Sequence, residues 1–483
     1  MKNPQHARLL LMLAGLGLSG CAAVGPDYVP PATGAPAGWT RLDPAARPVV
    51  HAAASGDLGQ WWQSLNDPLL SELIAEALQA SPDLRSAQAK LRESRARRTA
   101  TAAGQYPGVT ASGSASRNRS SGEAGSGATR NFFSAGFDAS WELDVFGGVR
   151  RSVEAAEADL ASTEASLENT RVSLAAEVAL NYVGVRALQN RLGIARANLA
   201  SQSETLQLTD WRAQAGLVSS QDVEQARSNR EQTGAQVPTL ETSLAEAEHT
   251  LDILLGRPPG TLHARLTAAN GLPAVPDRIA VGIPADTLRQ RPDVRVAERR
   301  LAAETARVGV AAAARYPSFN LSGSIGLDAL TIGALGNSGA AASSLFAGIT
   351  GPIFNAGRLR AQVEIQDAVR EQAQVTYEQT VLSALQEVEN ALVALARNRE
   401  RVEALAIAAE SARNAAQMAQ QRYRSGLVDF QSVLDTERSV LSVEDSLASS
   451  RADGVLALIR LYKALGGGWS PQAATRPAAK DAS

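Results

Sequence analysis

The sequence is poor in cysteine and histidine, and this shortage excludes several classes of protein. Cys21 is the single cysteine among 483 residues, so the chain cannot form an internal disulfide. The four histidines are dispersed, and no nucleophile–histidine–acid set, carboxylate pair or group of metal ligands occurs at a meaningful spacing. We therefore predict no enzyme, no metal site and no cofactor.

Aromatic residues and an excess of one charge are also lacking. The 47 basic and 49 acidic residues nearly cancel, which argues against a basic face for nucleic acid. Aromatic residues make up 4%, which is low for a compact globular core and typical of alanine-rich helical packing. Beyond the first twenty residues no segment is apolar enough for a transmembrane helix.

The N-terminus carries the signals of an exported lipoprotein. A basic start precedes the apolar stretch from Leu9 to Leu18, which is too short to span a bilayer. It ends in Leu18-Ser19-Gly20-Cys21, which resembles a bacterial lipobox. We expect residues 1–20 to be a signal peptide and Cys21 to carry lipid, the only covalent addition that we predict. An ordinary signal peptide with a chance cysteine is the alternative.

Most of the remaining chain consists of an internal duplication, in which motifs recur at an offset of about 210 residues. Ser81-Pro82-Asp83-Leu84-Arg85 recurs as Arg291-Pro292-Asp293-Val294-Arg295, and Gly216-Leu217-Val218 as Gly426-Leu427-Val428. We divide the chain into an N-terminal extended segment (21–67), a first repeat (68–256), a linker (257–277), a second repeat (278–466) and a tail (467–483) predicted to be disordered.

Each repeat contains two segments in which apolar and polar residues alternate, as in strands with one apolar face. The four predicted strands cover residues ~106–117, ~131–146, ~316–328 and ~343–354. About ten residues is the length of a tilted transmembrane strand. Four strands cannot close a barrel, and open edges are not tolerated in a bilayer, so strands in a membrane require an oligomer. A half-buried sheet in a soluble protein is the other interpretation of the alternation.

Very long helices follow the strands. Val381, Val388, Leu395, Val402 and further residues up to Tyr423 repeat every seven positions, which predicts coiled-coil packing. The helix after the first pair of strands would run from Val149 to about Gln214, roughly 100 Å at 1.5 Å per residue. Glycines stand at the ends of these helices and at the junctions between strands and helices.

Those glycines are of two kinds. Gly216 and Gly426 end the long helices and predict hairpin tips. Gly147, Gly148 and Gly357 stand where strand passes into helix, and their flexibility would allow the bend.

Several motifs together resemble the outer-membrane lipoprotein factors of tripartite efflux systems, the TolC-like, NodT-type partners of resistance-nodulation-division pumps. They include Val24-Gly25-Pro26-Asp27-Tyr28, Trp61-Trp62, Trp141 to Gly147 and Arg422-Tyr423-x-x-Gly426, and the resemblance spans about residues 10–468. It implies a mainly α fold with a membrane β part. Three chains would share one 12-stranded outer-membrane β-barrel, continuous with a long periplasmic α-helical coiled-coil barrel.

The resemblance also implies a function, partners and a gate. The homotrimer would passively conduct small molecules from periplasm to exterior after docking of a periplasmic adaptor and an inner-membrane pump. Asp435 matches the acidic residue whose threefold ring narrows the periplasmic aperture, while Tyr423 and Asp222 match positions that latch hairpins in the closed state. Ser432 stands where some relatives carry a second acidic ring, so strong cation binding is in doubt.

Simpler roles compete with two of these assignments. Asp222 suits a helix cap behind Ser219, and Tyr423 suits the last apolar knob of its heptad, whereas Asp435 lies too deep in its helix to cap. At the level of function, the alternatives are a conduit for protein secretion and a structural coiled-coil tether. The tether would explain the heptads and the lipid but not the duplicated strands. Drugs, solvents, metals and secreted polypeptides all remain possible cargo.

Overall fold

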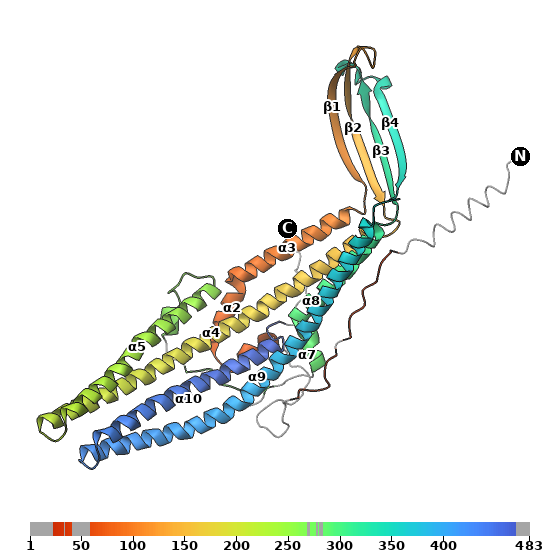
Figure 1. Cartoon of the computed structure of the whole chain (residues 1–483). Coiled ribbons are helices and arrows are strands. Elements are labelled where there is room, and N and C mark those ends of the chain that lie inside the picture. Colours follow the sequence, from red (N-terminus) through yellow and green to blue (C-terminus); the bar gives the residue numbers. More distant parts are fainter. Residues whose placement is uncertain are drawn as a thin grey trace, which may run out of the picture. The chain divides into compact units, whose positions relative to one another are not determined.

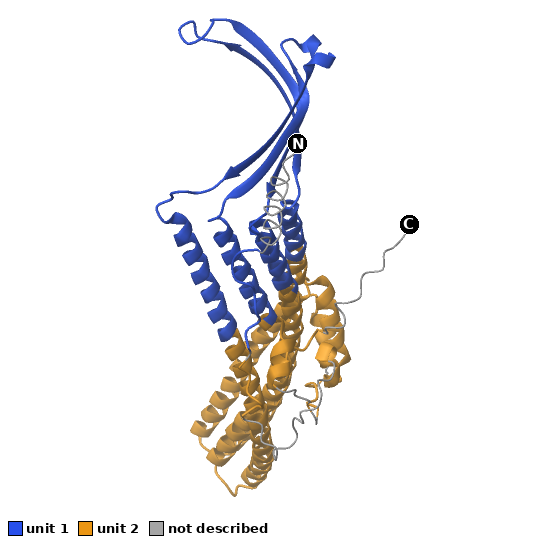
Figure 2. Ribbon diagram, turned by 90° about the vertical axis from the view of Figure 1, so that its right-hand side faces the viewer, with its two compact units in different colours: residues 1–32, 90–164, 295–379 blue, residues 33–89, 165–294, 380–483 orange. Residues whose placement is uncertain are grey.

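The computed structural model describes residues 23–32, 34–40, 58–267, 271–276, 279 and 284–469. The predicted signal peptide, Cys21, most of the predicted tail and parts of the predicted linker lie outside the described residues. The chain divides into two compact units, coloured separately in Figure 2. Unit 1 comprises residues 1–32, 90–164 and 295–379, and unit 2 comprises residues 33–89, 165–294 and 380–483. Both units therefore draw on both repeats.

Unit 1 contains one antiparallel sheet in the order β1-β2-β3-β4. Its strands are β1 (Gly108–Arg119), β2 (Thr129–Leu143), β3 (Ser318–Ala329) and β4 (Ala341–Thr350), which lie side by side in Figure 1. The two outer strands, β1 and β4, each have one edge without a partner strand among the described residues. β2 starts earlier than its alternation predicts because the polar residues before Phe132 still pair with β1, Thr129 opposite Arg119.

The predicted alternation gives the sheet two chemically different faces. On one face Phe137 lies opposite Ile325, and Trp141 opposite Leu321. On the other face hydroxyl groups bond across the strands, as in the pairs Ser114–Ser134 and Ser324–Ser344, both at 2.8 Å. An apolar face and a polar face suit a strand set with lipid on one side and water on the other.

The passage from sheet to helix is built on the predicted junction glycines. Gly147 has a φ of +82°, and α4 (Gly148–Gln214) begins at the next residue. The Asp144 carboxylate caps this helix by accepting hydrogen bonds from the backbone N–H groups of Val149 (2.9 Å) and Arg150 (2.8 Å). In the second repeat the chain also passes from strand to helix at a glycine with positive φ, Gly357 (φ +85°), directly before α9 (Arg358–Arg424).

The N-terminal segment packs beside the first of these junctions. The Val24 N–H donates to the Phe146 carbonyl oxygen at 3.1 Å, and Arg151 forms a 2.6 Å ion pair with Asp27. Gly25 has a φ of +95°, and a Cβ added to it would lie 2.4 Å from Cα of Gly309 in α8 (Pro292–Ala313). Only a glycine permits this approach of two backbones.

Unit 2 is helical. It holds η1 (Leu58–Leu65), α2 (Pro68–Ala80), the first turns of α3 (Pro82–Ala103), α5 (Ser220–Leu254), α6 (His263–Leu266), α7 (Pro284–Gln290), α10 (Phe430–Ala464) and the greater part of α4 and α9. Most of the predicted heptad positions of these long helices are buried, among them Val185, Leu192, Val388 and Leu395, whereas Leu199, Leu206 and Val402 are half-buried. Among the residues described, no helix combines the length and the hydropathy that crossing a membrane requires.

A buried carboxylate ties α2 to α4 inside unit 2. Asp67 caps α2 by accepting from the Leu70 N–H at 3.0 Å, and its other oxygen accepts from the Tyr182 hydroxyl at 2.7 Å. Burial raises the pKa of Tyr182 to about 12, so this hydroxyl stays protonated and donates at neutral pH. Arg186 donates to the same hydroxyl oxygen and to the Leu266 carbonyl.

The packed chain extends three residues beyond the predicted end of the second repeat, to Trp469. The Gly468 N–H donates to the Leu58 carbonyl at 2.9 Å, and the Trp469 indole donates to the Gln290 carbonyl at 3.1 Å. These bonds hold residues 467–469, which we predicted to be disordered, against η1 and α7.

Candidate functional site

Two helix hairpins in unit 2 carry the predicted site. The first joins α4 to α5 and the second joins α9 to α10, and both turn at a glycine with positive φ, +71° at Gly216 and +73° at Gly426. After each glycine the chain bonds back into the helix: the Leu217 N–H donates to the Arg212 carbonyl at 2.8 Å, and the Leu427 N–H to the Arg422 carbonyl at 2.9 Å. This is the Schellman arrangement, so the duplicated Gly-Leu-Val motif builds the same turn twice.

The second helix of each hairpin starts with an acidic cap. Ser219 and Asp222 form a capping box, in which the Asp222 carboxylate accepts from the backbone N–H and the hydroxyl of Ser219 at 3.0 and 2.9 Å. In the other hairpin the Asp429 carboxylate caps α10 by accepting a hydrogen bond from the backbone N–H of Ser432 at 3.1 Å. Hydrogen bonds from the hydroxyl and the backbone of Ser432 lower the pKa of Asp429. The cap accounts for the position of Asp222 within one chain, and its predicted role as a latch stays a prediction.

Tyr423 joins the two hairpins. Its side chain is 1% exposed, and its hydroxyl donates to Oγ1 of Thr209 in α4 at 3.3 Å. The Arg212 guanidinium lies 4.3 Å from the ring centroid and also donates to the Tyr423 carbonyl oxygen. A residue of the second repeat is thus held by two side chains of the first, through a cation–π contact and hydrogen bonds.

Apolar side chains surround this contact. Phe430 meets the Tyr423 ring edge-on at a centroid distance of 5.9 Å. The buried cluster around them comprises Ala226 of α5, Ala419 of α9, and Val433 and Leu434 of α10. A small pocket of about 620 Å³ opens beside the cluster, and Arg212, Asp222, Tyr423 and Asp429 are among its lining residues. The structure therefore brings Tyr423 and Asp222 to the rim of one pocket.

Asp435 lies apart from this pocket, on an exposed part of α10. Its carboxylate accepts a hydrogen bond from the Gln431 side chain at 2.9 Å. The Ser432 hydroxyl, at the position of the missing second acidic ring, donates to Asp429 at 2.7 Å. Asp435 is thus available to water and ions in the single chain.

Sequence reasoning missed Thr209 and Arg212. Both belong to α4, and their importance comes from Tyr423, a residue of the other repeat. One signal was present: Thr209 and Arg212 are three residues apart, so they lie on the same face of a helix at the level of the hairpin tip.

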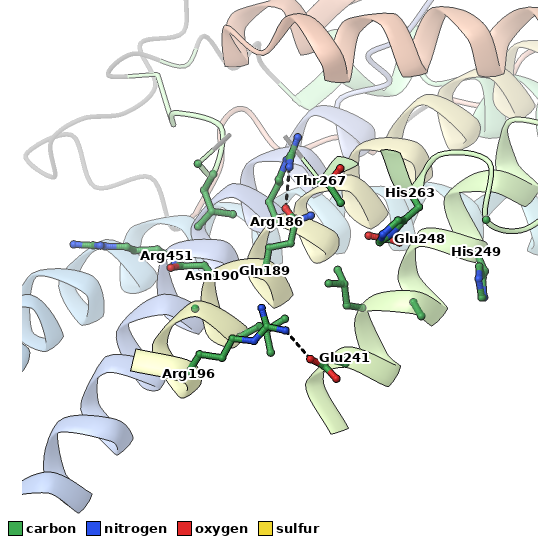
Figure 3. A pocket seen from close by; sticks show the side chains of 17 residues that line it. Arg186, Gln189, Asn190, Arg196, Glu241, Glu248, His249, His263, Thr267 and Arg451 are labelled. Carbon is green, nitrogen blue, oxygen red and sulfur yellow. Dashed lines mark hydrogen bonds and ion pairs between the residues drawn. The ribbon is translucent and has the colours of Figure 1, made fainter. Parts of the chain in front are cut away.

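A larger pocket of about 1080 Å³ lies elsewhere in unit 2, between α4 and α5 (Figure 3). Two pairs of charged side chains lie in it: Arg196 with Glu241 at 2.6 Å, and His263 with Glu248 at 2.8 Å. Within the described part of the chain no three histidine, cysteine or acidic side chains are grouped so as to hold a metal ion.

Comparison with known proteins decides the family. The family profile described as "Outer membrane efflux protein" matches residues 73–257 and 283–467, one match in each repeat. This chain belongs to the outer membrane efflux protein family.

Individual relatives of this outer membrane efflux protein resemble it over nearly their whole length. It is 34% identical over 486 residues to Nodulation protein T of Rhizobium leguminosarum bv. viciae, covering 98% of both chains. It is 33% identical to the pyoverdine export outer membrane protein OpmQ of Pseudomonas putida, covering 99% of this chain and 100% of the other. Among solved structures, the outer-membrane channel OprN superposes with a TM-score of 0.87 and 37% identity over 93% of this chain and all of that one.

The predicted family, fold class, function and location are thereby confirmed. The outer membrane efflux protein is a mainly helical chain with a small four-stranded antiparallel sheet, and its fold is that of the outer-membrane channel OprN. It is the outer-membrane component of an efflux system, with a tunnel in the periplasm.

Proposed function

We propose that the protein works as a homotrimer whose three sheets form one 12-stranded barrel. The supporting observation is the sheet itself, since β1 and β4 end it with edges that have no partner strand in the described chain. Unpaired backbone groups are very costly in a bilayer, so β1 of one copy would pair with β4 of the next. The apolar face with Phe137, Trp141 and Ile325 would then meet lipid, and the serine-rich face would line a wet lumen.

An apolar stripe on α9 supports the same assembly in unit 2. Leu382, Val393, Ile407 and Met418 are exposed, and their intervals of 11, 14 and 11 residues are close to whole helical turns. They therefore share one face of α9, while the heptad positions such as Val388 occupy the buried face. We assign this stripe to the contact with a neighbouring subunit.

The trimer is proposed to be a passive conduit for small molecules, gated at the hairpin tips. An inner-membrane pump of the resistance-nodulation-division type would supply the cargo, and a periplasmic adaptor would dock and open the tips. The Tyr423–Arg212–Thr209 contact holds the two hairpins of one subunit together, which suits a resting state. Secretion of polypeptides is the second candidate. Cys21, outside the described residues, would carry the lipid anchor in the outer membrane.

Conductance tests this function. Trimers reconstituted in planar bilayers are expected to conduct ions in discrete steps, and liposomes holding them to release small solutes but retain proteins. A preparation of folded trimers that never conducts would contradict the channel and favour a tether.

The acidic ring makes a prediction about ion preference. Asp435→Ala is expected to widen the resting pore and to lower its preference for cations several-fold, on the order of threefold, because three carboxylates are lost from one constriction. Single-channel conductance and reversal potentials in a salt gradient measure both effects. Gln431→Ala is the matched control, since it removes the hydrogen-bond donor of Asp435 but keeps the charge. Identical conductance and selectivity in wild type and Asp435→Ala would refute the ring.

The contact of Arg212 with Tyr423 makes a second prediction. Arg212→Gln is expected to raise the open probability of resting trimers by at least about tenfold, since each of the three copies loses a cation–π contact and a charged hydrogen bond together worth about 1–2 kcal/mol. Bilayer recordings without adaptor measure it. Arg424→Gln, which changes an exposed arginine of the second hairpin next to Tyr423, is the control and should behave as wild type. Equal open probabilities for Arg212→Gln and the control would show that the contact does not restrain the gate.

A further inference from the structure

A buried acid lies two residues after Asp435, in the interior of the hairpin packing. The side chain of Glu437 is 5% exposed. Its Oε1 atom accepts hydrogen bonds from the Thr205 hydroxyl of α4 at 2.6 Å and from the Gln420 amide of α9 at 3.2 Å. One carboxyl oxygen of α10 thus joins helices from both repeats.

The partners of Glu437 are neutral. Burial raises the pKa of this carboxyl, while the hydrogen bonds from Thr205 and Gln420 lower it by less. Within the described part of the chain no lysine, arginine or histidine forms an ion pair with Glu437, so its negative charge is not compensated by a cation. An uncompensated carboxylate inside a protein favours its neutral, protonated form.

Charged side chains on the neighbouring turns have partners of their own. Arg438 of α10 donates to Asn229 of α5 at 3.1 Å, and Arg413 of α9 pairs with Glu444 at 2.6 Å. On α5 the Arg230 guanidinium binds Glu231. The further charged groups on the neighbouring turns are Glu204, Asp210 and Arg212 of α4, Asp222, Glu224 and Arg227 of α5, Glu410, Arg422 and Arg424 of α9, and Asp429 and Asp435 at the start of α10.

A second buried polar group lies on the same stretch of α4 as Thr205, the partner of this acid. Gln202 lies one turn before Thr205 on the same side of α4, and it is 3% exposed. Neither its amide nitrogen nor its amide oxygen has a hydrogen-bond partner. An unpaired buried amide costs free energy, so this part of the packing is polar and easily perturbed by a charge.

Hydrogen bonds connect the acid to the gate tyrosine. Thr205 binds Glu437 through its hydroxyl, and its carbonyl oxygen accepts from the Thr209 hydroxyl at 2.8 Å. Thr209 in turn accepts from the Tyr423 hydroxyl. Any displacement of α10 from α4 at Glu437 therefore acts on the element that holds Tyr423.

We propose that Glu437 is a proton-operated latch of each subunit: protonated, it holds α10 against α4 and α9, and ionised, it favours their separation. The inference rests on the proposed function, in which the hairpins separate as the channel opens. The packed helices raise the pKa of Glu437, and separation would hydrate the carboxyl and return its pKa toward about 4.3. The packed state therefore binds the proton more tightly.

The sign of the pH response follows from this difference. Below the raised pKa the packed state is stabilised by the proton that it holds. As the pH rises from the ordinary pKa of a glutamate through the raised pKa of Glu437, that stabilisation is lost and the population of the separated state increases. Acid should keep the resting trimer closed, and alkali should ease its opening.

Spin labels on the two tips test the latch without relying on conduction. Leu217 and Leu427 are exposed, one on each hairpin, and each can be replaced by cysteine to attach a spin label. The chain has one cysteine of its own, Cys21, which we predict to carry lipid. In full-length trimers we expect the tip-to-tip distances to lengthen as the pH rises through the raised pKa of Glu437, because ionisation separates the helices. In Glu437→Gln, which keeps the acceptor oxygen but has no charge, the distances should stay short at every pH.

Controls separate this latch from the acidic ring. Asp435→Asn should keep the pH response of the distances, and so should Glu410→Gln, which removes an exposed acid of α9. A wild type without a pH response, or a Glu437→Gln trimer with the wild-type response, overturns the latch. Distances that respond to pH in a trimer that never conducts would support the latch and refute the channel function instead.

A second variant covers the case in which Glu437→Gln does not assemble. Thr205→Val removes a hydrogen bond that lowers the pKa of Glu437, so the midpoint of the pH response should move to higher pH. An unmoved midpoint overturns the proposal as well.

Discussion

Leu382→Glu is expected to abolish the trimer. Leu382 is 67% exposed on the apolar stripe of α9 that we assign to the subunit contact, and a glutamate there would be buried without a partner in each of three interfaces. Burying an unpaired charge costs several kcal/mol per ion, roughly 3 kcal/mol or more at each interface. Native mass spectrometry of the detergent-purified protein should therefore find trimers for the wild type and monomers for the variant.

The control for this variant uses the same helix and the same new residue. Ala394 is exposed on α9, twelve residues after Leu382 and therefore about 120° around the helix from it, so Ala394→Glu should remain trimeric. A trimeric Leu382→Glu protein would show that the stripe faces something other than a second subunit. A monomeric wild type would contradict the trimer itself.

Asp67→Ala is expected to destabilise the helical unit by about 2–4 kcal/mol. The change removes the cap of α2, worth about 1 kcal/mol, and leaves the buried Tyr182 hydroxyl without its acceptor. The loss concerns folding rather than gating, since Asp67 is remote in sequence from both hairpins. Thermal unfolding of the purified protein, followed by circular dichroism at 222 nm, measures it as a lower Tm.

Two variants test the reason for this effect. Asp67→Asn keeps an acceptor oxygen and should lose less stability, about 1 kcal/mol. Asp83→Ala removes an exposed acid from the first turn of α3 and should be nearly neutral. If Asp67→Ala and Asp83→Ala have the same Tm, the buried hydrogen bonds of Asp67 do not contribute the stability that the geometry suggests.

Features with a short repeat along the chain were predictable. The heptads of α9 predict which residues are buried, because Val388, Leu395 and Tyr423 follow from a period of seven alone. The hairpin glycines follow from the need for positive φ at a helix end. Both rules are local, and duplication of the chain supplied each signal twice.

Features that depend on distant partners were not predictable. Arg212 is one arginine among many on a helix surface until α9 places the Tyr423 ring beneath it. Glu437 looks like any acid of a charged helix, and only the packing of three helices shows that it is buried. The same limitation applies to Thr209, whose hydroxyl has a function only because a residue of the other repeat reaches it.

The order of strands in the sheet sets the order of events when the protein folds. β2 of the first repeat pairs with β3 of the second, as Leu143 with Phe319, so the middle of the sheet joins opposite halves of the chain. Closing so long a loop is slow, and a chain still emerging into the periplasm can form only the β1–β2 hairpin. The four-stranded sheet therefore cannot be completed until the second repeat has emerged as far as β4, and until then its exposed strand edges are open to aggregation.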